Sequence, residues 1–387
     1  METRAAILRE VPGRWEVHAV ELDPPREREV LVRIVASGLC HSDDHFATGD
    51  ITVGHLPICG GHEAAGVVEA VGPGVSLLEV GDHVVTSFIP SCGRCRWCAG
   101  GMHNLCDNGA LMLQGTQLDG TFRMHVGGED VAQAGLLSAF AEYSVMPEVS
   151  CIRIPRDVPL ETAALLGCAV PTGWGSAVNA AQVSPGDIVM VIGVGGIGIN
   201  AVQGARHAGA TRIIAVDPVE LKRAAALRLG ATDAFADHGE AADLARSLTN
   251  GQGADSAIVC IGVPTGADIG AAFAAIRKAG TVVVTGSAPD TASGIPVGLL
   301  ELGMYQKRIQ GSLYGMCSPV KDVPRLLRLW QEGQLKLEEL VSRTYSLDEI
   351  NQGYEDMHAG INLRGVLHLG DAAPATAAAA TDASATL

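Results

Sequence analysis

The sequence predicts an α/β protein in which a β-rich domain is joined to a doubly wound parallel sheet. The chain has 387 residues, more than one hydrophobic core usually organises. Its first 160 residues offer short apolar runs between Gly, Pro and Asp turns, and from about residue 170 strands and helices alternate. We therefore expect a first domain over 1–169, a second over 170–313, and a return to the first over 314–370.

The individual elements follow from local patterns. The runs EVLVRIVASG, GVVEAVG and DHVVTSF predict strands, whereas the polar, glycine-rich segment 102–135 predicts a long loop outside the core. In the second domain the pattern predicts strand 187–193, helix 197–208, strand 211–217, helix 222–229, strand 254–262, helix 267–279 and strand 280–286. Later, DVPRLLRLWQEG predicts an amphipathic helix, and the Ala/Thr-rich segment 371–387 a disordered tail.

Charge and composition indicate which binding partners and which cellular compartment to expect. The formal net charge of −16 and a pI near 5.1 argue against nucleic acid or an anionic membrane as a partner. The N-terminal residues carry charges where a secretory signal has its apolar core, and Gly, Asn, Gln or Pro interrupt the uncharged stretches 162–186 and 188–205. We expect a cytoplasmic protein, in which cysteines stay reduced and a tight cluster of them indicates a metal.

A dinucleotide site is predicted where GVGGIG follows an apolar strand and opens a helix. The residues of this turn that would approach a pyrophosphate are Gly193, Gly195, Gly196, Ile197 and Gly198. Asp217 ends the next predicted strand, where its carboxylate can accept hydrogen bonds from a ribose diol and would repel a 2′-phosphate. This favours NAD over NADP. Lys222 lies near enough in sequence to contact the same ribose, and a solvent-exposed lysine on a helix is an equally good interpretation.

The segment SCGRCRWCAGGMHNLC gathers thiols on one short loop, 91–107. Its cysteines are Cys92, Cys95, Cys98 and Cys106, the number of ligands that a closed tetrahedral zinc site needs. Iron also binds four thiolates, but a second redox centre is not needed beside a nicotinamide site. The expected role is structural, because the loop has few apolar residues of its own to bury.

A second metal site is suggested by three scattered residues. They are Cys40 in GLCHSDDH, His62 in GGHEAAG and Cys168 in LLGCAVPTG. Taken singly, each is more often an ordinary buried cysteine or a hydrogen-bonded histidine than a metal ligand. Taken together, two thiolates and one imidazole leave a fourth zinc position open for water or substrate, as a catalytic site requires.

These motifs together resemble the zinc-dependent medium-chain alcohol dehydrogenases over about residues 3–370. GHEAAGVVEAVGPGV is similar to the zinc signature of that family, CHSD to its first-ligand motif, and GVGGIG to its cofactor turn. The resemblance implies a GroES-like catalytic domain and a Rossmann cofactor domain. It also implies NAD and two zinc ions per subunit, a catalytic one on Cys40, His62 and Cys168 and a structural one on the cysteine-rich loop.

The resemblance implies roles for further residues around the catalytic zinc. Glu63 would lie behind the metal, and Asp43 would orient His62 through its other ring nitrogen. Ser42 and His45 match the proton-relay positions of the family. The implied activity is oxidation of a primary alcohol to an aldehyde.

On the cofactor side, the resemblance implies that Thr172 contacts the nicotinamide and Arg364 the pyrophosphate. His41 stands where the family often has a basic residue near the pyrophosphate. Phe88 and the small residues Ala134 and Gly135 would line the substrate pocket, which would leave room for an aromatic alcohol.

Alternatives remain within and outside this activity. LGCAVPTGWGSAV and INAVQGARHAGA resemble the NDMA-dependent branch, nicotinoproteins that keep NAD(H) bound and pass electrons to another acceptor. Glutathione-dependent formaldehyde dehydrogenases are also similar, but they carry an arginine just beyond the fourth structural cysteine, where this chain has CDNGA. A cofactor-binding sensor without catalysis is disfavoured because the catalytic ligands are intact. The family resemblance also implies a homodimer or homotetramer formed through an edge strand within 295–312.

Overall fold

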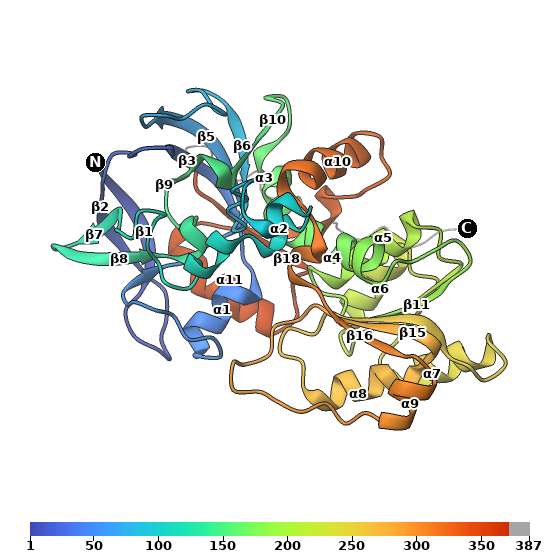
Figure 1. Cartoon of the computed structure of the whole chain (residues 1–387). Helices are drawn as coiled ribbons and strands as arrows, with labels where there is room; N and C mark the ends of the chain where they lie inside the picture. Colours follow the sequence, from blue (N-terminus) through green and yellow to red (C-terminus); the bar gives the residue numbers. More distant parts are fainter. Residues whose placement is uncertain (371–387) are drawn as a thin grey trace, which may run out of the picture.

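A computed structural model describes residues 1–370, so the predicted tail 371–387 lies outside the described residues. Figure 1 shows a β-rich part, an α/β part, and a C-terminal segment that returns to the β-rich part. Within residues 1–370, none of the helices combines the length and the apolar character needed to cross a bilayer.

Strands from the first part of the chain close a small barrel in the order β1-β2-β7-β8-β4. Their bounds are β1 Glu2–Leu8, β2 Glu16–Leu22, β4 Ile58–Cys59, β7 Met124–Val126 and β8 Glu129–Gln133. The hairpin of β7 and β8 lies inside segment 102–135, so the prediction of a loop outside the core is wrong there. Met124, Val131 and Ala132 are fully buried, but strands this short show no periodicity that a sequence pattern could reveal.

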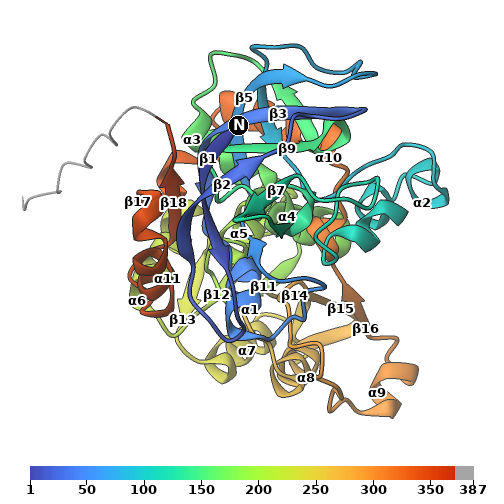
Figure 2. The same cartoon turned by 90° about the vertical axis from the view of Figure 1, so that its left-hand side faces the viewer.

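A mixed sheet follows the order β10-β6-β5-β3-β18-β17, and β9 also pairs with β3. The bounds are β3 Glu29–Gly38, β5 Ala64–Val71, β6 His83–Thr86, β9 Tyr143–Pro147, β10 Cys151–Ile154, β17 Val341–Tyr345 and β18 Arg364–His368. β18 runs antiparallel to β3, with Val366 opposite Gly38. The last described strand therefore completes a sheet begun near the N terminus, as the turned view in Figure 2 shows.

The α/β part holds a parallel sheet in the order β13-β12-β11-β14-β15-β16. Its strands are β11 Ile188–Ile192, β12 Arg212–Val216, β13 Asp233–Phe235, β14 Ala254–Val259, β15 Ile276–Val284 and β16 Arg308–Gly311. Its helices are α5 Gly198–His207, α6 Glu220–Leu229, α7 His238–Ser247, α8 Gly266–Ala275 and α9 Leu299–Met304. The predicted helix 267–279 is too long, because the backbone is already extended at Ile276, which is buried in β15.

Short helices connect and cover the sheets. They are α1 His41–Thr48, α2 Arg96–Ala99, α3 Leu160–Ala164, α4 Ala169–Gly175, α10 Pro319–Gln331 and α11 Ile350–His358. α10 contains the predicted amphipathic helix except for its last two residues. α4 approaches the turn before α5 closely, since an ideal Cβ on Gly173 would lie 2.0 Å from the carbonyl oxygen of Ile197. A glycine at this position therefore lets the second half of α4 lie against the GVGGIG turn.

Candidate functional site

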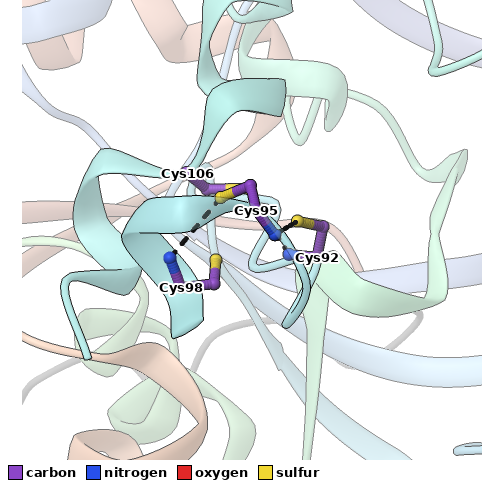
Figure 3. Close-up of side chains that lie close together, drawn as sticks. All are labelled: Cys92, Cys95, Cys98 and Cys106. Carbon is purple, nitrogen blue, oxygen red and sulfur yellow. Dashed lines mark hydrogen bonds between the residues drawn. The ribbon is translucent and has the colours of Figure 1, made fainter. Parts of the chain in front are cut away.

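The cysteine-rich loop brings its thiols together. Residues 1–370 contain two groups of side chains placed to hold a metal ion, and in the first the sulfurs of Cys92, Cys95, Cys98 and Cys106 lie within 4.8 Å of one another. Figure 3 shows them gathered around α2, where backbone N–H groups donate to sulfur atoms at 3.4 Å. The N–H of Cys98 lowers the pKa of Cys95 to about 6. Four converging thiols, at least one of them favoured as thiolate, fit a closed tetrahedral zinc site.

The second group joins residues that are far apart in sequence. Cys40, His62 and Cys168 are buried, and their ligand atoms lie within 4.8 Å of one another. Cys40 immediately precedes α1 and Cys168 immediately precedes α4, so the two thiols are placed by the first residues of two different helices. Two thiols and one imidazole fit zinc with one coordination position left open.

Asp43 orients His62. The carboxylate is fully buried, with Oδ2 3.0 Å from His62 Nδ1, and Oδ1 accepts the N–H of Gly61 at 2.9 Å. A carboxylate at this position favours the tautomer with the proton on Nδ1, so the lone pair of Nε2 is free for a metal. The structure thus brings Asp43 beside His62 as the family resemblance implies.

Glu63 and Arg364 form a buried ion pair behind the metal ligands. Arg364 Nε donates to Glu63 Oε1 at 3.2 Å, and Arg364 Nη2 donates to Oε2. Glu63 Oε2 also accepts the N–H of Ala169, the residue after Cys168, at 3.0 Å. On its other side Arg364 borders the nucleotide turn, since an ideal Cβ on Gly196 would lie 3.0 Å from Arg364 Nη1. The pyrophosphate contact of Arg364 stays a prediction.

The GVGGIG turn is tight and has free space on one side. An ideal Cβ on Gly198 would lie 1.9 Å from the carbonyl oxygen of Gly193, so a side chain there would break the turn. An ideal Cβ on Gly195 would have nothing within 4 Å. The backbone of the turn is therefore open beside Gly195, at the start of α5, where a pyrophosphate can be bound.

Asp217 connects this turn to the next strand. Its Oδ2 accepts the N–H of Val194 at 3.0 Å and its Oδ1 accepts the N–H of Val219 at 2.9 Å. Each oxygen keeps a second lone pair with which it can accept from a ribose hydroxyl. Lys222 lies half-buried in the first turn of α6, whereas its neighbour Arg223 donates to the carbonyl oxygen of Asp217 at 2.8 Å.

Comparison with known proteins agrees with this geometry. The model for alcohol dehydrogenase GroES-like domains matches residues 26–156, and the model for zinc-binding dehydrogenases matches residues 196–332. An NDMA-dependent alcohol dehydrogenase from Amycolatopsis methanolica is 50% identical over 367 residues, which cover 95% of this chain and 99% of that one. The chain belongs to the zinc-binding alcohol dehydrogenase family.

Solved structures of other alcohol dehydrogenases have the same fold. An alcohol dehydrogenase zinc-binding domain protein from Burkholderia ambifaria has a TM-score of 0.89 and 36% identity, covering 96% of this chain and 99% of that one. Benzyl alcohol dehydrogenase from Acinetobacter calcoaceticus has a TM-score of 0.88 and 32% identity, covering 96% and 100%. The predicted combination of a GroES-like domain with a Rossmann-type parallel sheet is confirmed. Membership in the family implies zinc and a nucleotide cofactor.

In this alcohol dehydrogenase the expected relay residues lie along α1. The thiol of Cys40 donates to Ser42 Oγ at 3.6 Å. His45 lies one turn further, almost completely buried, with Nδ1 3.0 Å from Asp50 Oδ2. On α4, Thr172 Oγ1 lies 4.0 Å from the sulfur of Cys168. Ser42 and Thr172 thus each lie beside the sulfur of one candidate ligand, and His45 lies one helical turn beyond Ser42.

His41 faces the cofactor domain of the dehydrogenase. An ideal Cβ on Gly262, just after β14, would come within 3.0 Å of the His41 ring. Asp44 Oδ2 lies 3.7 Å from His41 Nε2 and 2.7 Å from Nε2 of His358 on α11. Sequence reasoning missed His358, because it is remote in the chain and belongs to no motif.

The expected pocket residues lie beside His62. The Phe88 ring is 5.3 Å from the His62 ring, edge to face, and an ideal Cβ on Gly135 would lie 3.1 Å from Phe88 Cβ. Ala134 directly precedes Gly135 and is buried. Tyr314, whose ring is 5.4 Å from that of Phe88, extends this aromatic wall and was also missed from sequence.

Proposed function

We propose that this alcohol dehydrogenase oxidises primary alcohols to aldehydes and transfers the hydride to NAD. The proposal rests on one arrangement: Arg364 borders both Glu63, behind the metal ligands, and Gly196, in the nucleotide turn. The metal ligands and the cofactor turn are therefore separated by about one side chain. In the balanced reaction the alcohol gives a hydride to NAD⁺ and a proton to the protein, which yields an aldehyde, NADH and a proton.

The residues around the candidate zinc site have different roles in the proposed reaction. A zinc ion held by Cys40, His62 and Cys168 would supply a Lewis acid that makes the alcohol hydroxyl more acidic. Ser42, next to the sulfur of Cys40, is placed to accept the proton of that hydroxyl. The carboxylate of Asp43 holds the imidazole of His62 in place.

The cofactor assignment depends on Asp217. A bound nicotinamide dinucleotide would supply the hydride acceptor. The buried carboxylate of Asp217 favours a ribose diol and would repel a 2′-phosphate. Thr172, four residues after Cys168, is near enough to contact the nicotinamide from α4.

An aromatic alcohol is supported as the substrate. The Phe88 ring lies beside that of His62 and the Tyr314 ring beside that of Phe88, and the missing side chain at Gly135 lets the backbone approach Phe88, since an ideal Cβ there would lie 3.1 Å from Phe88 Cβ. The similarity to a benzyl alcohol dehydrogenase supports the same class. We propose that benzyl alcohol and other primary alcohols enter this pocket.

A second candidate is a nicotinoprotein that keeps NAD(H) bound and gives electrons to another acceptor. The observation in its favour is the relative that is named for its dependence on NDMA. In this version the alcohol half of the reaction is unchanged. Only the reoxidation of the nicotinamide differs, because it requires an electron-acceptor partner in place of cofactor exchange.

The deciding experiment supplies benzyl alcohol to the purified protein with free NAD as the sole acceptor. Sustained NADH production supports an ordinary dehydrogenase. A single turnover, with nicotinamide recovered from the denatured protein and activity restored by an artificial dye, supports the nicotinoprotein.

A second experiment tests the assigned catalytic site. A Cys168→Ala variant that keeps full activity and its zinc would refute the assigned catalytic site.

We also propose that the subunits associate through the edge strand β16 and the neighbouring helix α9. On α9, Leu299, Leu300 and Met304 are 81%, 70% and 74% exposed. Apolar exposure of this extent next to an open strand edge is typical of a protein interface. Leu299→Glu combined with Leu300→Glu should yield monomers in light scattering. An unchanged mass would contradict this interface.

A further inference from the structure

The proposed reaction releases a proton, and α1 offers a path for it away from the metal ligands. Ser42 Oγ contacts the sulfur of Cys40, and His45 lies three residues later, on the same face of the helix. The path cannot end at His45, because this side chain is only 1% exposed. The His45 ring must therefore transfer the proton to another group, and that group must release it to water.

Asp50 connects His45 to the surface. Its Oδ2 lies 3.0 Å from His45 Nδ1 and accepts the hydroxyl of Thr48 at 2.9 Å. The Asp50 side chain is 30% exposed, so the same carboxylate also meets solvent. Hydrogen bonds from His45 and Thr48 lower the pKa of Asp50, and the group is therefore a carboxylate at neutral pH.

Hydrogen bonds from the cofactor domain hold the loop that carries Asp50 in place beside His45. The N–H of Asp290, in the cofactor domain, donates to the carbonyl oxygen of Asp50 at 3.0 Å. The carboxylate of Asp290 is engaged by Thr52 Oγ1 at 2.8 Å, so it does not compete for His45. The other titratable ring facing His45 is that of His41, 5.0 Å away.

Asp44, the other carboxylate near His45 on α1, is bonded to different side chains. Asp44 on α1 is bonded to His358 and approaches His41, as described above. Among the described residues, the carboxylate bonded to His45 is thus that of Asp50.

We propose that Asp50 is a positioning residue for proton release. Its carboxylate holds the His45 ring with a proton on Nδ1, so that Nε2 can accept the proton that comes from the alcohol by way of Ser42. As the Nε2–H bond forms, the Nδ1–H bond breaks, and the Nδ1 proton passes to Asp50 and then to water. No electrons move in this step. The inference rests on the proposed function and extends its proton path to the surface.

The test follows hydride and proton separately in a single turnover. Benzyl alcohol is mixed with the NAD-loaded protein in weak buffer, with absorbance at 340 nm reporting nicotinamide reduction and a pH-indicator dye reporting proton release. Asp50→Asn keeps the size of the side chain but removes its charge and basicity. Asp50→Glu is the conservative variant, and Asp130→Asn is the matched control, because Asp130 Oδ1 bonds Nδ1 of the half-buried His125 at 2.9 Å in the β7–β8 hairpin.

We expect Asp50→Asn to slow proton release roughly tenfold, a typical size for loss of an acid–base partner, and to raise the solvent isotope effect. Asp50→Glu should restore most of the rate, and Asp130→Asn should match the unmodified protein. Melting temperature, zinc content and affinity for NAD should be unchanged in all three. Proton release from Asp50→Asn at the unmodified rate, with the same pH profile, would overturn the inference. No absorbance change in the unmodified protein, with zinc and cofactor bound, would instead refute the proposed function.

Discussion

Glu63 and Arg364 are separated by 301 positions in the sequence, and they form a bidentate ion pair in the interior. Glu63 is fully buried and Arg364 is 6% exposed. Neither charge reaches water, so each depends on the other for compensation. The pair also joins β18, the last strand of residues 1–370, to the residue that follows His62.

Loss of Arg364 should destabilise the protein far more than loss of a surface arginine. We expect Arg364→Met to lower the free energy of unfolding by about 3–5 kcal/mol, because the Glu63 carboxylate is left buried without a partner. Urea unfolding followed by tryptophan fluorescence measures this. Arg4→Met is the control: Arg4 pairs with Asp348 at the surface, and its loss should cost less than about 1 kcal/mol. Equal effects of the two changes would contradict the prediction.

The structural zinc should be separable from the catalytic one. Cys95→Ala removes one of four thiols from the cysteine-rich loop, so we expect the metal content to fall from two zinc ions per subunit to one. The melting temperature should fall as well, because the loop loses its main constraint. Cys151→Ala is the control, since Cys151 is buried outside both ligand groups and should leave both zinc ions in place. Metal analysis that finds two zinc ions in the Cys95 variant would argue against this site.

Cofactor choice should depend on Asp217. In Asp217→Ser the negative charge that would repel a 2′-phosphate is gone, so the ratio of NADP to NAD affinity should rise by at least about tenfold, equivalent to 1.4 kcal/mol. Absolute NAD affinity should fall, because the bonds to Val194 and Val219 are weakened. Fluorescence titration of the cofactor-free protein measures both. Asp243→Ser, on the exposed face of α7, should change neither; an unaltered ratio in the Asp217 variant would exclude this role.

The contact between Asp290 and the loop after α1 should slow cofactor release. Asp290 bonds both Asp50 and Thr52, across the two domains that enclose the cofactor turn and the metal ligands. In Asp290→Gly the hydrogen bond from Thr52 to the Asp290 carboxylate is lost and the loop is less constrained, so NADH dissociation should accelerate by about three- to tenfold. Stopped-flow displacement of NADH measures the rate. Thr52→Val removes the same hydrogen bond without freeing the backbone and should have the smaller effect; a rate unchanged in both variants would show that the loop does not limit release.

The cofactor half of the fold was predictable because its strands and helices are long enough to show their periods. β11, α5 and β12 fall within a few residues of the predicted ranges. β7, with three residues, is shorter than any period that can be recognised, and the end of α8 depends on how Ile276 is buried in the sheet.

The site was predictable where residue types and motifs define it. The four cysteines of one loop needed only their spacing, whereas the grouping of Cys40, His62 and Cys168 depended on the family resemblance. Asp50 could not be assigned, although it is only five residues from His45, because a single aspartate in a turn has no motif. The partner of Glu63 is decided by the pairing of β18 with β3, a long-range contact that no local pattern encodes.

The position of β18 also bears on how the protein is made. During synthesis β3 and β5 leave the ribosome early, yet the arginine that neutralises Glu63, at the start of the strand that completes their sheet, is translated 301 positions after Glu63. The N-terminal domain therefore keeps an open sheet edge, and the Glu63 carboxylate has no ion-pair partner, until the nucleotide-binding domain has been synthesised. A nascent chain stalled before Arg364 should remain a client of chaperones, and one stalled well beyond His368 should not.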